Sequence, residues 1–191
     1  MSLARRALAE GLGTALLLAA VVGSGIMGER LAGGSLGLAL LANTLATGAA
    51  LLALIHALGP VSGAQFNPAV TLVEAWQGRL PWREAPVYLL VQLLGAFVGV
   101  AVAHLMFGEA LFSPSTTERS GAAQAFSEGV ATFGLLLLIG LCGARKPGAL
   151  PVVVAAYISS AYWFTASTSF ANPAVTLARA ATDTFAGIRP A

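Results

Sequence analysis

The sequence is poor in charged residues. Asp, Glu, Lys and Arg make up 9% of its 191 residues, hydrophobic residues make up 57%, and the mean hydropathy is +0.82. Because a soluble domain carries about 25% charged residues, a chain of this composition cannot cover a surface that faces water. The composition therefore predicts a polytopic membrane protein rather than a soluble helical bundle.

Cysteine and basic residues are also scarce. The single cysteine, Cys142, cannot form an intrachain disulfide, and nothing around it has the spacing of a metal site. The net charge of +2 leaves no basic stripe for nucleic acid. The sequence shows neither a nucleophile–base pair nor a phosphate-binding loop. We therefore expect no enzymatic activity, no metal, no cofactor and no nucleic-acid partner.

Long apolar stretches are what the sequence has in abundance, each near the roughly 20 residues that a helix needs to cross the hydrocarbon core. They lie at about 7–27, 36–58, 86–107, 123–142 and 149–166. These stretches predict an all-α polytopic membrane protein. Glu10, at the start of the first stretch, argues against a cleaved signal peptide. With the N-terminus in the cytoplasm, six Lys and Arg residues fall in cytoplasmic segments and four in outer ones, a mild positive-inside bias.

One hexapeptide, NPAVTL, occurs twice, at 67–72 and at 172–177. Each copy follows two apolar stretches, the first of which opens with Glu-Gly, at Glu10 and at Glu128. Two halves of three membrane crossings each, an odd number, must insert with opposite topology. The sequence thus predicts a membrane channel built as an inverted repeat.

The repeat boundaries follow from this pattern. A single transmembrane channel domain would span 1–191, with a first repeat at about 1–107 and a second, incomplete repeat at about 120–191. The chain ends where the third span of the second repeat should begin. We therefore expect a sixth span to be missing from this chain.

Each NPAVTL copy has the chemistry of a helix start. Asn caps free backbone N–H groups, and Pro at the first helical position has no N–H to leave unsatisfied. The stretches that follow, to about Gln77 and about Asp183, are too short to span a bilayer, so each copy should open a half-helix inside the membrane. The loops before them are tolerable at that depth only along a water-filled path. The two N-termini, each with roughly half a positive charge, would form a polar constriction that is hostile to cations.

Paired NPA motifs in inverted halves, with a glutamate in the first and fourth spans, resemble the aquaporin and glycerol-facilitator family (major intrinsic proteins). The resemblance covers the chain except for the missing last helix. It implies six spans, two half-helices, a pore in each protomer, a homotetramer in membrane lipid, and the passage of water and small neutral solutes. The implied location is a bacterial inner (cytoplasmic) membrane with a cytoplasmic N-terminus.

The resemblance also assigns roles to residues. Glu10 and Glu128 would brace the loops that lead into the half-helices, although intramembrane carboxylates also fit a proton relay. The pore constriction would consist of Asn67, Pro68, Ala69, Asn172, Pro173 and Ala174. The outer selectivity filter, counted from the two motifs, would consist of Thr47, Ser160 (or Ala161 if the register slips by one), Ser169 and Val175.

This filter departs from the family's water-selective pattern. Water-selective members carry an arginine directly after the second NPA, where this chain has Val175. Arg179 lies about one helical turn further on, and we expect it not to reach the same point. Three small polar residues and a valine would make a wide ring without fixed charge. Solutes larger than water should then pass, and the exclusion of cations should rest more on the half-helix dipoles.

A bacterial subgroup in which valine replaces the filter arginine is associated with arsenic resistance, and this sequence resembles it. The cargo would be neutral metalloid hydroxides such as As(OH)3 or methylated arsenicals, although glycerol or urea would suit the same ring. Two other interpretations stay open, namely a proton-coupled secondary transporter with broken helices and a non-conducting truncated fragment. A dependence of flux on a proton or sodium gradient would identify the transporter.

Overall fold

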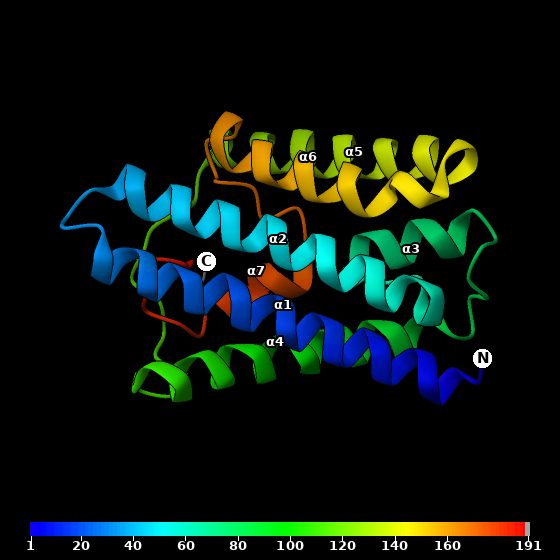
Figure 1. The fold of residues 1–191 in the computed structure, drawn as a ribbon, viewed down its shortest axis with the longest axis horizontal. Coiled ribbons are helices and arrows are strands. Elements are labelled where there is room, and N and C mark those ends of the chain that lie inside the picture. The colour runs from blue at the N-terminus through cyan, green and yellow to red at the C-terminus, as the bar shows by residue number, and fades with distance from the viewer. Residues whose placement is uncertain (190–191) are drawn as a thin grey trace.

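The computed structural model describes residues 1–189, and every regular element in that range is helical (Figure 1). The elements are α1 (Leu3–Leu31), α2 (Leu36–Ser62), α3 (Pro68–Trp76), α4 (Ala85–Phe107), α5 (Ala122–Arg145), the 3-10 turn η1 (Pro147–Ala149), α6 (Leu150–Phe164) and α7 (Pro173–Arg179). Five of the described helices, α1, α2, α4, α5 and η1 with α6, are long and apolar enough to cross a membrane. The predicted all-α polytopic fold is confirmed.

The spanning helices start and end close to the predicted apolar stretches, but several of them are longer. α1 begins at Leu3 because the Ser2 side chain caps it by accepting a hydrogen bond from the Arg5 N–H at 3.5 Å. α2 continues to Ser62 and ends where Gly63 takes a left-handed conformation with φ 93°. Hydropathy marks the apolar part of a helix, whereas caps decide where the helix ends.

α1 and α4 cross with very little space between their backbones. A Cβ atom added to Gly95 would clash with the carbonyl oxygen of Gly11, and one added to Gly99 would clash with that of Ala15. Small residues four positions apart on both helices allow this approach, which dispersion forces then stabilise in lipid. The same crossing places Glu10 of α1 against Gln92 of α4.

Gly99→Leu is expected to prevent the correct packing of α1 on α4. The new side chain would meet helix backbone and the Cβ of Leu18, which is fully buried, so neither neighbour can move aside cheaply. Overpacking of this kind costs about 1–3 kcal/mol or more. Thermal unfolding in detergent, followed by tryptophan fluorescence, measures the loss. Gly140→Leu is the control because a Cβ at Gly140 of α5 meets nothing within 4 Å; equal stability of the two variants would contradict the prediction.

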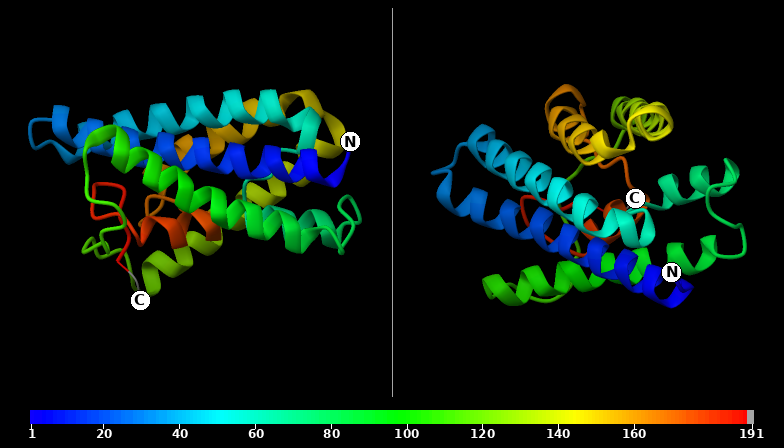
Figure 2. Two further views of the ribbon diagram at one scale, coloured as in Figure 1. Left: turned by 90° about the horizontal axis from the view of Figure 1, so that it is seen from below. Right: turned by 45° about the vertical axis from the view of Figure 1, so that its right-hand side comes forward.

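α5 and α6 form a second layer beside α2. α6 packs on α2, and α5 packs on α6, so that these two helices stand apart from α1 and α4 (Figure 2, right). The buried residues of α5 are Ala131 and Leu135, and its exposed side chains are largely apolar. An apolar helix that faces away from the protein is suited to contact with lipid.

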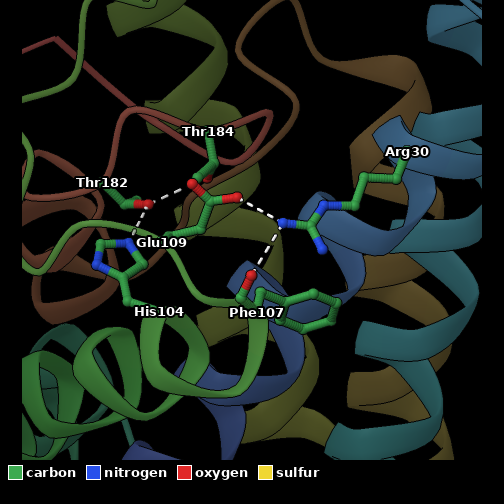
Figure 3. Close-up of polar contacts among 6 residues, drawn as sticks. All are labelled: Arg30, His104, Phe107, Glu109, Thr182 and Thr184. Atoms are coloured by element: carbon green, nitrogen blue, oxygen red, sulfur yellow. Dashed lines mark hydrogen bonds and ion pairs between the residues drawn. The ribbon is translucent and has the colours of Figure 1, made fainter.

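The segment after α7 folds back beside the α4–α5 connection (Figure 2, left). The side chains of His104 on α4 and Thr182 lie 2.7 Å apart, and Arg30 at the end of α1 pairs with Glu109 at 2.8 Å (Figure 3). α7 ends at Arg179, four residues before the predicted limit of about Asp183. It ends there because the Arg179 carbonyl accepts a hydrogen bond from the N–H of Ile188, in the returning segment, at 3.1 Å.

Candidate functional site: a pore between two half-helices

The two NPAVTL copies each open a short helix, α3 and α7, and these helices extend from the middle of the molecule towards opposite ends (Figure 1). The Asn67 side chain accepts a hydrogen bond from the Ala69 N–H at 2.9 Å. The Asn172 side chain accepts from the N–H groups of Ala174 and Val175 at 3.1 and 3.3 Å. Local cap chemistry thus fixes both helix starts.

The two motifs are joined to each other by a reciprocal pair of hydrogen bonds. The Asn67 amide donates to the Ala171 carbonyl at 2.7 Å, and the Asn172 amide donates to the Phe66 carbonyl at 2.8 Å. One amide hydrogen of each asparagine is committed to this contact, and an amide carries a second one. The positive ends of α3 and α7 therefore face the same space at the middle of the fold.

The loop before α3 is held by Glu10, which is fully buried. Its carboxylate accepts hydrogen bonds from the backbone N–H groups of Gln65 and Phe66 at 3.0 and 2.7 Å, and from the Ser62 hydroxyl at 2.6 Å. Gln92 of α4 donates to it at 2.9 Å. Phe66 has a φ of 50°, a left-handed conformation that is unusual outside glycine, so these contacts hold a strained backbone in place.

Glu128 makes the corresponding contacts to the loop before α7. It accepts hydrogen bonds from the Phe170 N–H at 3.0 Å, from the Ala171 N–H at 2.7 Å, and from the Ser167 hydroxyl. Ala171 is also left-handed, with a φ of 43°. The two halves thus repeat the same arrangement of one carboxylate, one serine and a left-handed loop.

Sequence reasoning missed the two serines. Ser62 and Ser167 are 105 residues apart, the same offset that separates Asn67 from Asn172. An alignment of the two halves on NPAVTL would have found them. Gln92 carries no such signal, because its contact with Glu10 depends on the α1–α4 crossing.

A cavity of about 510 Å³ lies between the half-helices and is lined by both asparagines. Its lining extends from Glu74 near the end of α3 and Arg79 just after that helix to Arg179, the last residue of α7. Because α3 and α7 extend towards opposite ends of the fold, this cavity reaches towards both. The loops contribute residues 63–67 and 169–172, so non-helical segments line the space.

Three of the four predicted filter residues, Thr47, Ser169 and Val175, line this cavity, and each is less than 7% exposed. The fourth, Ser160, is not among the lining residues. Ser160 is exposed on the other side of α6, where its hydroxyl donates to the Tyr157 carbonyl at 2.7 Å. Ala161, the alternative by one register step, is buried but does not line the cavity either.

Tyr162 takes the place expected for Ser160. Successive residues of a helix are about 100° apart, so residues two positions apart point about 200° apart. The cavity-lining residues of α6 follow a four-residue spacing, namely Leu150, Val154, Ile158 and Tyr162. The Tyr162 hydroxyl donates to the Thr47 hydroxyl at 3.3 Å. This four-residue spacing was visible in the sequence.

Arg119, in the connection between α4 and α5, holds the loop before α7. It donates to the Thr168 hydroxyl at 2.5 Å and to the Phe185 carbonyl at 3.0 Å. Burial lowers the pKa of its guanidinium from its usual value, and arginine stays charged under all ordinary conditions. The loop before α7 thus has a fixed positive charge beside it.

Comparison with known proteins places this arrangement in a family. The family model described as "Major intrinsic protein" matches residues 1–162. The chain is 57% identical over 189 residues to "Aquaglyceroporin AqpS" of Rhizobium meliloti (strain 1021). This match covers 98% of the chain and 80% of that protein. It is 32% identical over 153 residues to "Probable glycerol uptake facilitator protein" of Thermotoga maritima, with 73% of the chain and 64% of that protein covered.

A solved structure shares the fold. The X-ray structure of the aquaglyceroporin from Plasmodium falciparum matches with a TM-score of 0.68 at 22% identity, over 94% of this chain and 78% of that one. Six helices line the cavity, namely α1, α2, α3, α5, α6 and α7. Residues 1–162 contain the first NPA motif and the lining residues of all of these helices except α7. Together these similarities show that the chain belongs to the major intrinsic protein family, and so is a membrane channel protein and not an enzyme.

Proposed function

We propose that this chain is a passive channel that conducts water and small neutral polar solutes such as glycerol. The observation that carries the proposal is the single cavity that both Asn-Pro motifs line and that reaches towards both ends of the fold. Two helix N-termini with free amide donors orient the oxygen of a neutral solute and repel cations. The names of the relatives, an aquaglyceroporin and a glycerol uptake facilitator, agree with this chemistry.

The coupling of transport to a proton gradient is not favoured. Glu10 and Glu128 each accept hydrogen bonds from two backbone N–H groups and a serine hydroxyl, so both carboxylates are engaged in holding the loops. We propose that both residues brace the loops.

The outer ring favours solutes wider than water. Thr47 and Ser169 are small and polar, and Val175 stands where an arginine would narrow the pore. Neutral metalloid hydroxides such as As(OH)3 present the same uncharged hydroxyl surface as glycerol, and we propose them as further permeants. The pore constriction in this proposal is formed by the motif residues Asn67, Pro68, Ala69, Asn172, Pro173 and Ala174.

The placement in the cell and the assembly are also proposals. We place the N-terminus in the cytoplasm and the protein in a bacterial inner membrane, as a homotetramer. The chain then forms one domain, 1–191, with repeats at about 1–107 and 120–191, of which residues 190 and 191 lie outside the described residues. The equivalent positions of α3 and α7, and of Glu10 and Glu128, support the division into repeats.

Stopped-flow light scattering on proteoliposomes of this chain tests the function. Water, glycerol and arsenious acid are each expected to enter faster than in empty liposomes, at rates that an imposed proton or sodium gradient leaves unchanged. Glycerol entry at the rate of empty liposomes would contradict the wide-ring proposal. Rates that follow the gradient would identify a coupled transporter instead, and no entry of any permeant would identify a non-conducting chain.

A further inference from the structure

Arg179 is the last residue of α7 and lines the same cavity as Val175. Residues four positions apart on a helix lie on one face, so the long side chain of Arg179 follows Val175 along the cavity wall. Its exposed fraction is 2%, which places its charge inside the protein. The ring expected to have no fixed charge therefore has a guanidinium one helical turn away.

The guanidinium is held on two sides. Its Nε donates to the Ala186 carbonyl, and its Cζ lies 4.9 Å from the centroid of the Phe170 ring, within the range of a cation–π contact. Phe170 belongs to the loop that Glu128 braces. The position of the charge is thus fixed by the same loop that leads into α7.

Among residues 1–189, no carboxylate forms an ion pair with Arg179 within 4 Å. The ion pairs in that range join Arg6 to Glu84, Arg30 to Glu109 and Arg79 to Glu74. A guanidinium has five N–H donors, and within the described residues the hydrogen bond of Arg179 is made by Nε alone. The Nη donors are therefore available to a solute in the cavity.

Ser169 supplies a second polar group to the same wall. Its hydroxyl is buried, lines the cavity and has no hydrogen-bond partner among the described residues. A buried hydroxyl without a partner is costly, and a solute oxygen that reaches it would satisfy it. One strong donor and one hydroxyl that can donate or accept face the same space.

We propose that Arg179 and Ser169 select the solute in the outer half of the pore, and that Arg179 excludes cations in place of an arginine at position 175. This inference rests on the proposed channel function. The solute class is a small neutral molecule whose hydroxyl oxygens accept hydrogen bonds from the guanidinium and exchange one with the serine, such as a polyol or a neutral metalloid hydroxide. Cations are excluded because a desolvated unit charge in the pore repels them strongly.

Proteoliposomes of Arg179→Gln and Arg179→Lys test the proposal, with water flux, glycerol flux and potassium and proton leak measured on each. Arg179→Gln is expected to raise the cation leak relative to water flux by about tenfold and to lower glycerol flux. Arg179→Lys keeps the charge and should keep most of the exclusion. The control is Arg83→Gln, because Arg83 lies exposed in the connection between α3 and α4 and should behave as wild type.

Two outcomes would overturn the inference. One is an Arg179→Gln variant with the cation exclusion and the glycerol-to-water ratio of wild type. The other is an equal loss of water flux in Arg179→Gln and Arg179→Lys, which would assign Arg179 to the support of Phe170 and Ala186 alone. If wild type itself passes neither water nor glycerol, the proposed function fails and the inference falls with it. If wild type conducts water and glycerol and the Arg179 variants behave as wild type does, the inference fails but the proposed function stands.

Discussion

Glu10→Gln is expected to destabilise the channel more than any surface substitution. The carboxylate accepts hydrogen bonds from the Ser62 hydroxyl, from the N–H groups of Gln65 and Phe66, and from Gln92. A glutamine amide offers one oxygen in place of two and turns an NH2 group towards these donors. Replacing one oxygen leaves two donors without an acceptor, and since each such buried donor costs about 1–3 kcal/mol, the loss is about 2–6 kcal/mol.

The consequence reaches the pore because the loop is strained. Ala64 and Phe66 both have left-handed backbone, with φ of 48° and 50°, and such residues persist only where the surroundings hold them. Without the brace, the Phe66 carbonyl leaves the Asn172 amide, and the two half-helices lose their mutual contact. We therefore expect water flux to fall together with the melting temperature.

Glu29→Gln is the matched control. Glu29 lies on the same helix, α1, but its side chain is exposed. Thermal unfolding by tryptophan fluorescence and osmotic water flux are measured on both variants. Equal stability of Glu10→Gln and Glu29→Gln would contradict the bracing role. A proton relay would be supported instead if wild-type flux depended on the proton gradient and the Glu10→Gln variant kept its stability but lost that dependence.

The sequence was sufficient for those features that depend on local chemistry. The starts of α3 at Pro68 and of α7 at Pro173 follow from Asn-Pro, because a cap and a first-turn proline act within a few residues. The spanning helices follow from hydropathy, since about 20 apolar residues have no other stable arrangement in a bilayer. Their exact ends did not follow, because caps at Ser2 and Gly63 lie outside the apolar stretches.

The sequence was insufficient where the position of a side chain depends on a distant element. Ser160 was placed in the filter by counting back from Asn172 across a loop that has no regular structure. Thr168 and Ser169 in that loop are left-handed, with φ of 62° and 48°. Counting residues across such a loop does not determine which residue of α6 faces the cavity. A shift of two residues turns a helical side chain to nearly the opposite face, and Tyr162 faces the cavity instead.

Arg179 shows a different limit. Its distance from Val175 along the helix was correct, about one turn, but a cavity that extends along α7 receives side chains from successive turns. A flexible side chain as long as arginine also acts well beyond its own Cα. A filter described as a single ring of four positions could not include it.

Val175→Arg is expected to abolish most of the glycerol flux while leaving water flux. Val175 is 6% exposed and lines the cavity beside Thr47 and Ser169. A longer, charged side chain at this point must extend into the space that the solute uses. Glycerol, which is wider than water, then loses its path. A decrease of about tenfold or more corresponds to about 1.4 kcal/mol added to its barrier.

The new charge also meets an existing one. Arg179 lies four residues further along the same helical face, so two guanidinium groups share one desolvated wall and repel each other. We expect the variant to have a lower melting temperature than wild type but to remain folded, because the cavity of about 510 Å³ leaves room for the side chain to turn away from Arg179. The double variant Val175→Arg/Arg179→Gln relieves the repulsion and should recover stability.

Val175→Met separates charge from bulk. Methionine is about as long as the stem of arginine and carries no charge, so it narrows the ring without adding a donor. If Val175→Met keeps glycerol flux while Val175→Arg loses it, the charge at this position and its hydration close the pore to glycerol. If both variants lose glycerol equally, width alone sets the selectivity at Val175. Wild-type glycerol flux in Val175→Arg would show that the narrowest point lies elsewhere, and the reciprocal Asn67 and Asn172 contacts would then be the place to seek it.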